Sequence, residues 1–185
     1  MLRFPMESDR EAFVSLRQRS RPHLEPWDPI PPSGLNLYSE EAFERELETC
    51  NSEREQRWFI FSAANQMLVG RIALTNIERG VFLNGRLGYW VGAEFQGQGL
   101  MTEALKLVVE HCFAPEEHAG LGLHRLCANI MPINTRSRAL LQRVSFRQVG
   151  LSEHYLQIQG SWQAHEHWAL TVEQYTAAGS DAVAR

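Results

Sequence analysis

The sequence has few of the features that mark secreted, metal-binding or membrane-spanning proteins. Its three cysteines, Cys50, Cys112 and Cys127, are odd in number and have no Cys-x-x-Cys spacing, which argues against a disulfide framework and against a zinc site. No apolar run approaches the roughly 18–20 residues of a membrane span. Residues 1–10 also lack the basic-then-apolar pattern of a signal peptide. We therefore expect a cytoplasmic protein that binds no membrane and no metal.

Lysine is almost absent, since Lys106 is the only one in the chain, and the formal net charge is −4. This acidic balance argues against binding nucleic acid through general charge. It favours a cationic partner, such as a basic peptide or an amine. The length of 185 residues and the 44% hydrophobic content are ordinary for one soluble domain. We expect that domain to cover residues 1–176, with a disordered tail over 177–185.

The spacing of apolar residues predicts a mixed α/β fold of the α+β kind. We expect about four main helices, at residues 10–21, 40–50, 101–113 and 134–144, with Ser39 and Asn134 as caps of the second and fourth. Five prolines between Pro22 and Pro32 predict a long irregular loop rather than a helix.

About seven strands should form the central sheet. They are expected at residues 2–4, at two stretches joined near 64–65, at 86–92, at 124–131, and in a hairpin whose Gly160–Ser161 turn suits type II′. This order predicts a mostly antiparallel sheet with one strand–helix–strand crossover over residues 87–131.

The stretch Gln96-Gly97-Gln98-Gly99 joins an expected strand to an expected helix. Glycines permit a positive φ, so that successive backbone N–H groups turn toward one point, and the helix start adds free N–H groups and a positive dipole end. This arrangement predicts an anion site, for which a pyrophosphate is the natural ligand. The stretch has neither a GxxxxGK[ST] nor a GxGxxG pattern, and a tight strand-to-helix turn would look the same.

Residues 96–101 resemble the [Q/R]xxGx[G/A] signature of the GNAT acetyltransferase superfamily, with Met101 at its last position. The segments HLEPWDP, NIERGVF, LGYWVG, QGQGLMTEAL, LHRLCANIMPINTRSRALLQRVSF and YLQIQGSWQAH follow the order seen in RimJ-type ribosomal-protein N-terminal acetyltransferases, over residues 2–171. The resemblance implies the GNAT fold, acetyl-CoA as cosubstrate and direct transfer to an amine. That amine would be the α-amino group of a ribosomal protein beginning with Ala or Ser.

The same resemblance assigns roles to individual residues. The backbone of Trp90 or Val91 would donate to the thioester carbonyl, and Asn134 would hydrogen-bond the pantetheine arm. Ser137 would lie near the sulfur, with Tyr155 as the rival proton donor. The remaining acetyl-CoA contacts would come from Gln96, Gly97, Gln98, Gly99, Leu100, Met101, Thr102 and Asn129. Without the resemblance, Asn134 and Ser137 read as an ordinary helix start, and Tyr155 as a cross-strand aromatic.

The chain departs from the RimJ-type pattern at two positions. Ala164 stands in place of an acidic residue, and Ser145 stands in place of a glycine. If position 145 needs a positive φ, its serine is strained by about 1 kcal/mol.

Other features leave alternatives open. Glu25, Asp28 and His154 are candidates for a general base, and each also reads as an exposed polar residue. His165 and His167 share one strand face but have no third metal ligand, and Cys127 reads as a core thiol. The rival functions are acetylation of a small amine, such as a polyamine or antibiotic, and a non-catalytic acyl-CoA-binding module. The protein is expected to be a monomer or a homodimer.

Overall fold

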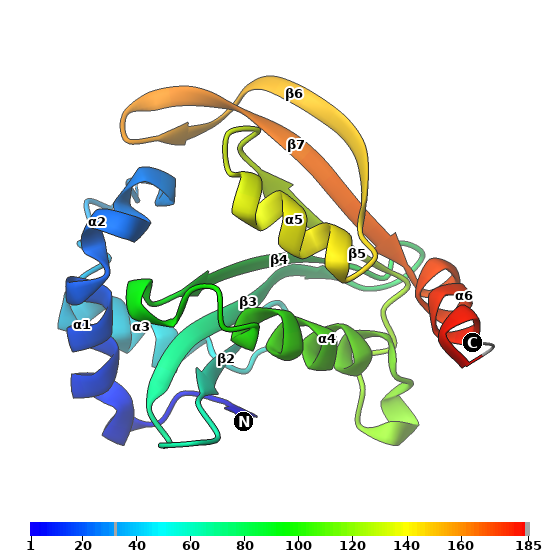
Figure 1. The fold of residues 1–185 in the computed structure, drawn as a ribbon, viewed down its shortest axis with the longest axis horizontal. Helices are drawn as coiled ribbons and strands as arrows, with labels where there is room; N and C mark the ends of the chain where they lie inside the picture. The colour runs from blue at the N-terminus through cyan, green and yellow to red at the C-terminus, as the bar shows by residue number, and fades with distance from the viewer. Residues whose placement is uncertain (32, 184–185) are drawn as a thin grey trace.

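The computed structural model describes residues 1–31 and 33–183, arranged around a seven-stranded sheet of order β1-β2-β3-β4-β5-β7-β6 (Figure 1). The strands are β1 (Leu2–Arg3), β2 (Gln56–Phe61), β3 (Leu68–Glu78), β4 (Asn84–Val91), β5 (Arg125–Ile130), β6 (Arg147–Ile158) and β7 (Ser161–Thr171). Each neighbouring pair is antiparallel except β4 and β5, which are parallel. The predicted mostly antiparallel sheet of about seven strands is therefore confirmed.

Six α-helices lie within the described residues, against about four expected. They are α1 (Arg10–Arg19), α2 (Arg21–Leu24), α3 (Glu40–Thr49), α4 (Leu100–Phe113), α5 (Thr135–Arg143) and α6 (Val172–Val183). Short 3-10 turns are η1 (Glu7–Asp9), η2 (Glu25–Trp27), η3 (Ala93–Phe95) and η4 (Glu116–His118). Both predicted caps are confirmed, because the side chain of Ser39 accepts from the N–H of Ala42 and that of Asn134 from the N–H of Ser137.

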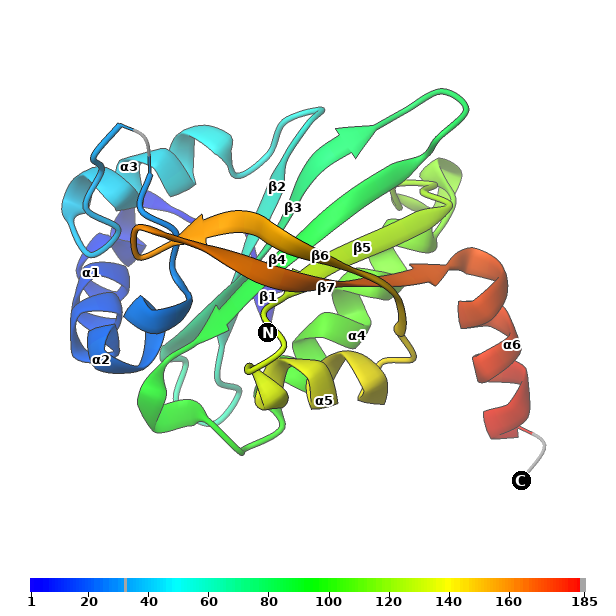
Figure 2. The same ribbon diagram turned by 90° about the horizontal axis from the view of Figure 1, so that it is seen from above.

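Two hydrophobic clusters pack on opposite faces of the sheet. Leu105 and Val108 of α4 and Leu141 of α5 pack with Leu126 of β5 on one face. Phe13 of α1, Phe43 of α3, Phe59 of β2 and Trp90 of β4 form the cluster on the other face. The second cluster covers only the β1–β4 side, and the β6–β7 hairpin arches over the remainder (Figures 1 and 2).

The parallel pair β4–β5 separates soon after it starts. Pairing extends only over Asn84–Arg86 with Arg125–Cys127, whereas the two strands continue to Val91 and Ile130. Beyond this point β4 keeps its bonds to β3, and β5 keeps its bonds to β7. The sheet is thus split between its two central strands at their carboxyl ends.

The sequence predicts an irregular loop for the proline-rich segment, but part of the segment is helical. Helix α2 carries Pro22 in its first turn, and η2 carries Pro26 near its start. A proline at the first positions of a helix removes only an N–H that would have no partner there. Of the five prolines, Pro32 lies outside the described residues.

The turn of the β6–β7 hairpin was also predicted incorrectly. Its two residues are Gln159 and Gly160 rather than Gly160 and Ser161, and both have a positive φ, of 48° and 80°. Two successive positive φ values define a type I′ turn, whose twist matches that of the flanking strands.

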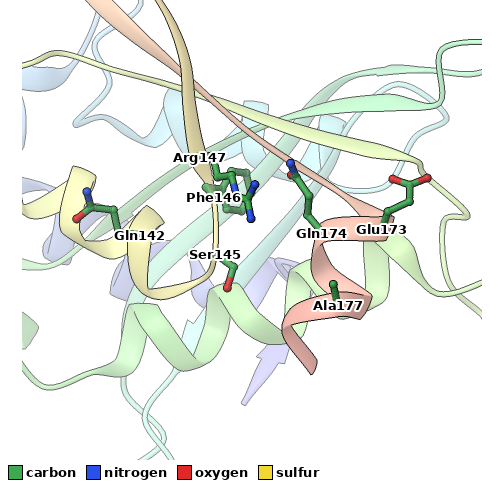
Figure 3. Close-up of a pocket in the computed structure, with 7 residues that line it drawn as sticks. All are labelled: Gln142, Ser145, Phe146, Arg147, Glu173, Gln174 and Ala177. Atoms are coloured by element: carbon green, nitrogen blue, oxygen red, sulfur yellow. The ribbon is translucent and has the colours of Figure 1, made fainter. Parts of the chain in front are cut away.

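Ser145 follows α5 with a φ of 68°, the left-handed conformation that commonly ends a helix and is usually taken by glycine. It lines a shallow hollow of about 540 Å³ together with Gln142, Arg147, Glu173 and Ala177 (Figure 3). The hollow lies between the end of α5, the start of β6 and α6, away from the split between β4 and β5. We assign no catalytic role to the residues that line this hollow.

Helix α6 ends at Val183 and so enters the segment 177–185, for which the sequence predicts a disordered tail. Residues 184–185 lie outside the described residues. In the described ranges, every helix is too short or too polar to cross a membrane.

Candidate functional site

The glycine loop has the backbone geometry that the sequence predicts. Gly97 and Gly99 have φ values of 73° and 79°, and a Cβ at either position would meet no atom within 4 Å. Glycine is therefore required by the backbone conformation and not by crowding. Within the described part of the chain, the N–H groups of Gly97, Gln98 and Gly99 donate to no protein acceptor. These free donors stand directly before α4, as an anion site needs.

Side chains fix the loop from both sides. Gln98 Nε2 donates to the carbonyl of Glu94 at 3.0 Å, and Gln96 Nε2 donates to the carbonyl of Ala93 at 3.2 Å. The guanidinium of Arg136, on α5, donates to Gln96 Oε1. Arg136 therefore adds a cation beside the loop, and this residue was not identified from the sequence. Its partner lies 40 positions away in the chain, so no local pattern could indicate the pair.

The first turn of α4 contains the other predicted loop residues. Met101 is 8% exposed and packs in the core with Leu105, so only its backbone N–H is available to a ligand. Leu100 and Thr102 are half-buried. In the described chain the Thr102 hydroxyl has no protein partner, which leaves it free for an anion at the helix start.

Trp90 and Val91 end β4 beside the split. The Trp90 ring is 9% exposed and packs edge-on against Phe13 at a centroid distance of 5.9 Å. The N–H of Gly92 donates to the carbonyl of Val69 on the β3 side at 2.8 Å. Because N–H directions alternate along a strand, the N–H of Trp90 also points to β3, and that of Val91 points toward the split. Val91 is therefore the better-oriented of the two predicted oxyanion donors.

Ser137 and Tyr89 meet across the split. Ser137 is 9% exposed in the first turn of α5, and its Oγ lies 2.6 Å from the hydroxyl of Tyr89 on β4. Burial raises the pKa of Tyr89, which keeps its hydroxyl protonated at neutral pH and able to donate. Sequence analysis predicted Ser137 and missed Tyr89, although Tyr89 shares its strand face with Val91.

Tyr155 belongs to a second polar group on the opposite face of the sheet. Its hydroxyl accepts from Asn129 Nδ2 at 3.1 Å, and Asn129 Oδ1 lies 2.8 Å from His167 Nδ1. The other ring nitrogen, His167 Nε2, lies 2.8 Å from Ser152 Oγ. The structure therefore does not bring Tyr155 next to Ser137, because α5 packs on one face and the Asn129 side chain lies on the other.

The three general-base candidates lie in different surroundings. Asp28 accepts from Arg17 at 2.8 Å and from the Tyr38 hydroxyl at 2.7 Å, which makes it part of a structural ion pair. Glu25 pairs with Arg21 on the surface. His154 is exposed, with a φ of 49°. None of the three contacts the Tyr155–Asn129–His167 group among the described residues.

The remaining candidates are Cys127 on β5 and the histidine pair on β7. Cys50, Cys112 and Cys127 are free thiols, and burial raises the pKa of Cys127. His165 and His167 lie beside Tyr155 with centroid distances of 5.6 Å and 4.8 Å. In the chain as far as it is described, no three His, Cys, Asp or Glu side chains cluster around a common point.

Comparison with known proteins gives consistent matches. The family described as "Acetyltransferase (GNAT) domain" matches residues 1–147. The [Ribosomal protein uS5]-alanine N-acetyltransferase of Escherichia coli is 31% identical over 174 residues, which are 91% of this chain and 86% of that protein.

Solved structures show the same fold. RimJ of Mycobacterium smegmatis, in complex with CoA-disulfide, has a TM-score of 0.83 and 30% identity, over 96% of this chain and 88% of that one. Spermidine N-acetyltransferase of Vibrio cholerae, in complex with CoA and spermine, has a TM-score of 0.76 over 95% of this chain and 97% of that one. Its identity is only 18%, so the likeness concerns the fold alone.

Proposed function

The chain belongs to the GNAT acetyltransferase family, and from this premise we propose that it acetylates the α-amino group of a protein, using acetyl-CoA. It is an N-acetyltransferase related to the ribosomal-protein-alanine enzymes. We propose a ribosomal protein that begins with Ala or Ser as the acceptor, in the cytoplasm. The observation that carries the proposal is the split between β4 and β5, with the free N–H groups of the glycine loop at its edge.

Acetyl-CoA would bind along the glycine loop and the start of α4. The free N–H groups of Gly97, Gln98 and Gly99 and the start of α4 would hold the pyrophosphate. Arg136, beside Gln96, would add a positive charge to the same anion. The Asn134 Oδ1 atom caps α5 and the Asn134 backbone N–H donates to the Met131 carbonyl, so we assign its contact with the pantetheine arm to the side-chain Nδ2 group. Asn129 would contribute through its backbone, because its side chain is engaged with Tyr155 and His167.

The split between β4 and β5 would let the acetyl group reach the sheet face that carries Tyr155, where the acceptor amine would bind. The amine attacks the thioester carbonyl, and the carbonyl oxygen gains negative charge as the C–N bond forms. The N–H of Val91 points toward this position and would stabilise the charge, a contribution of about 3–4 kcal/mol where such donors have been removed. Trp90 would act by packing, which holds the end of β4 in place.

The leaving thiolate needs a proton, which Ser137 would supply. Its Oγ is hydrogen-bonded to Tyr89, whose own proton can replace the one that Ser137 gives up. The protein's attacking α-amine has a reference pKa of about 7.7–8.0, so part of it is neutral at pH 7. A weak base or a water chain then suffices to take the amine proton, and Tyr155, which is held by Asn129, would orient the amine through a hydrogen bond.

The test compares acceptors under one set of conditions. The protein is incubated with radiolabelled acetyl-CoA and Ala- or Ser-starting peptides, and separately with polyamines and aminoglycosides. We expect labelled peptides and no labelled small amine. Labelling of amines alone would reject the protein acceptor, and acetyl-CoA binding without transfer to any amine would favour a non-catalytic module.

A further inference from the structure

We propose that the acceptor is chosen by an anionic side chain close to its N-terminus, which binds Arg86 and Arg125. This inference rests on the proposed function and names the chemistry of the acceptor. Both arginines line a cavity of about 230 Å³ on the sheet face that carries Tyr155, Asn129 and His167. The cavity lies where β4 and β5 are still paired, directly below the point where they separate.

Strand register places Arg86 and Arg125 close together on one face of the sheet. Arg86 of β4 is opposite Cys127 of β5, and Arg125 is opposite Asn84, so the two arginines are diagonal neighbours on one face. Arg86 is exposed and Arg125 is half-buried. In the described chain neither has a carboxylate within 4 Å or a hydrogen-bond acceptor. Most other arginines near acids, such as Arg17, Arg57 and Arg71, are paired.

The cavity has an excess of positive charge. Glu78 is the carboxylate that lines it, against two guanidinium groups, and its other polar walls come from Asn84, Asn129 and Tyr155. Phe82, 47% exposed, lies at the same rim and offers an apolar surface for the peptide. Guanidinium groups bind carboxylates through paired, charge-assisted hydrogen bonds. A carboxylate side chain on the acceptor therefore fits this site, whereas a polyamine would meet like charge there.

The tip of the β6–β7 hairpin contacts the α2–η2 segment at the other end of this face. At the tip of the β6–β7 hairpin, Gln159 Nε2 donates to the carbonyls of Glu25 and Asp28 at 3.0 and 3.1 Å. This contact joins the hairpin to the α2–η2 segment and bridges the face beyond the wide end of the split (Figure 2). A chain whose amine reaches the split would then leave past Arg86 and Arg125. The local charge thus reverses the expectation, based on the net charge of −4, that the partner is cationic.

The experiment measures kcat/KM for three Ala-starting peptides that differ only in Glu, Gln or Lys at positions two to four. For the wild-type protein we expect the Glu peptide to exceed the Lys peptide by about tenfold or more, and the advantage to shrink at high ionic strength. In the double variant Arg86→Gln, Arg125→Gln, the ratio should fall to about threefold or less. The double variant Arg45→Gln, Arg143→Gln, at exposed positions on α3 and α5 outside this cavity, changes the charge equally and should keep the ratio.

The outcomes separate the two proposals. Acetylation of all three peptides at equal rates, or a preference that survives in the double variant, overturns the acidic-acceptor inference and leaves the protein acceptor in place. Failure to acetylate any peptide overturns the proposed function together with this inference. Acetyl-CoA binding by each variant, single and double, checks that the variant is folded. The ionic-strength series tests the charge preference in the wild-type protein, without any substitution.

Discussion

The hydroxyl of Tyr89 lies 2.6 Å from Ser137 Oγ, which joins the strand before the glycine loop to the helix on the far side of the split. The contact crosses the region where β4 and β5 no longer pair. It brings two hydroxyl groups together beside the split, and by resemblance to the GNAT superfamily Ser137 is expected near the sulfur of acetyl-CoA.

Ser137→Ala should lower kcat by about 10- to 100-fold, the weak end of general-acid catalysis, because a thiolate is a modest base. The affinity for acetyl-CoA should stay within about twofold, since the cap bond to Asn134 uses the backbone N–H. Tyr89→Phe should show part of the loss, and the double variant little more than Ser137→Ala alone, because the hydroxyls act together. Steady-state rates and calorimetric binding measure this, and unchanged turnover in Ser137→Ala would reject its role.

Gly99→Ala should weaken acetyl-CoA binding by about tenfold. Alanine at a φ of 79° is strained by about 1–2 kcal/mol, and relief of the strain turns the N–H groups away from the ligand. Gly80→Ala is the matched control, because Gly80 has a φ of 71° and equally open surroundings but lies in the β3–β4 turn. It should lose stability and keep its affinity. Equal affinity of Gly99→Ala and wild type would show that the loop does not hold the ligand.

Ser145→Gly should raise the free energy of unfolding by about 1 kcal/mol, because glycine adopts the φ of 68° without strain. Ser145→Ala keeps the Cβ and should gain nothing, which separates relief of backbone strain from loss of the hydroxyl. Urea unfolding of the three proteins provides the measurement. A gain in both variants would instead implicate the serine side chain.

His165 should make the protein less stable in mild acid. It is 4% exposed, and burial is the main cause that lowers its pKa, with a smaller opposing effect of the bond to the Gln163 carbonyl. The unfolded chain, with a histidine pKa near 6.5, then binds the proton more readily. This part of the stability is complete above pH 6.5 and is lost as the pH falls from there through the lowered folded-state pKa.

The test compares urea unfolding at pH 7.5 and pH 5.5. The stability lost between the two values should be smaller in His165→Gln than in wild type. His118→Gln, at an exposed position, should behave as wild type does. Equal losses in all three proteins would show that His165 is protonated as easily in the folded state as in the unfolded one.

Local signals predicted the elements that depend on neighbouring residues. Ser39 and Asn134 were expected as caps because a side-chain oxygen reaches an N–H three residues on, and both bonds are present. The loop conformation of Gly97 and Gly99 follows for the same reason, since glycine is the residue that takes a positive φ freely. These expectations need no knowledge of strand pairing.

The misjudged elements show the limits of composition. Pro22 was taken as a sign of irregular structure, yet in the first turn of α2 it removes no bond. The hairpin turn was placed one residue late, because Gln159 adopts a positive φ that its residue type does not favour. In both places, the position of a residue within its element outweighed its intrinsic preference.

The contacts that assemble the site could not be predicted from the sequence, because they join residues that are far apart in the chain. Tyr89 and Ser137 are 48 positions apart, and Asn129 and His167 are 38 apart. Each pair depends on which residues face each other once β4, β5 and β7 are aligned, and a shift of one residue would turn every side chain to the other face. The resemblance to a known family identified Ser137 and Tyr155, but only the register places them on opposite faces of the sheet.

The central claim is that the acetyl group passes through the split to a protein α-amine, and one measurement tests it most directly. An Ala-starting peptide with an internal lysine is incubated with acetyl-CoA and the wild-type protein, in competition with spermidine, and the acetylated atom is located by fragment mass spectrometry. The account predicts acetyl on the α-amine, with the lysine and spermidine unmodified. Acetyl on spermidine or on the lysine, with the α-amine free, would contradict it.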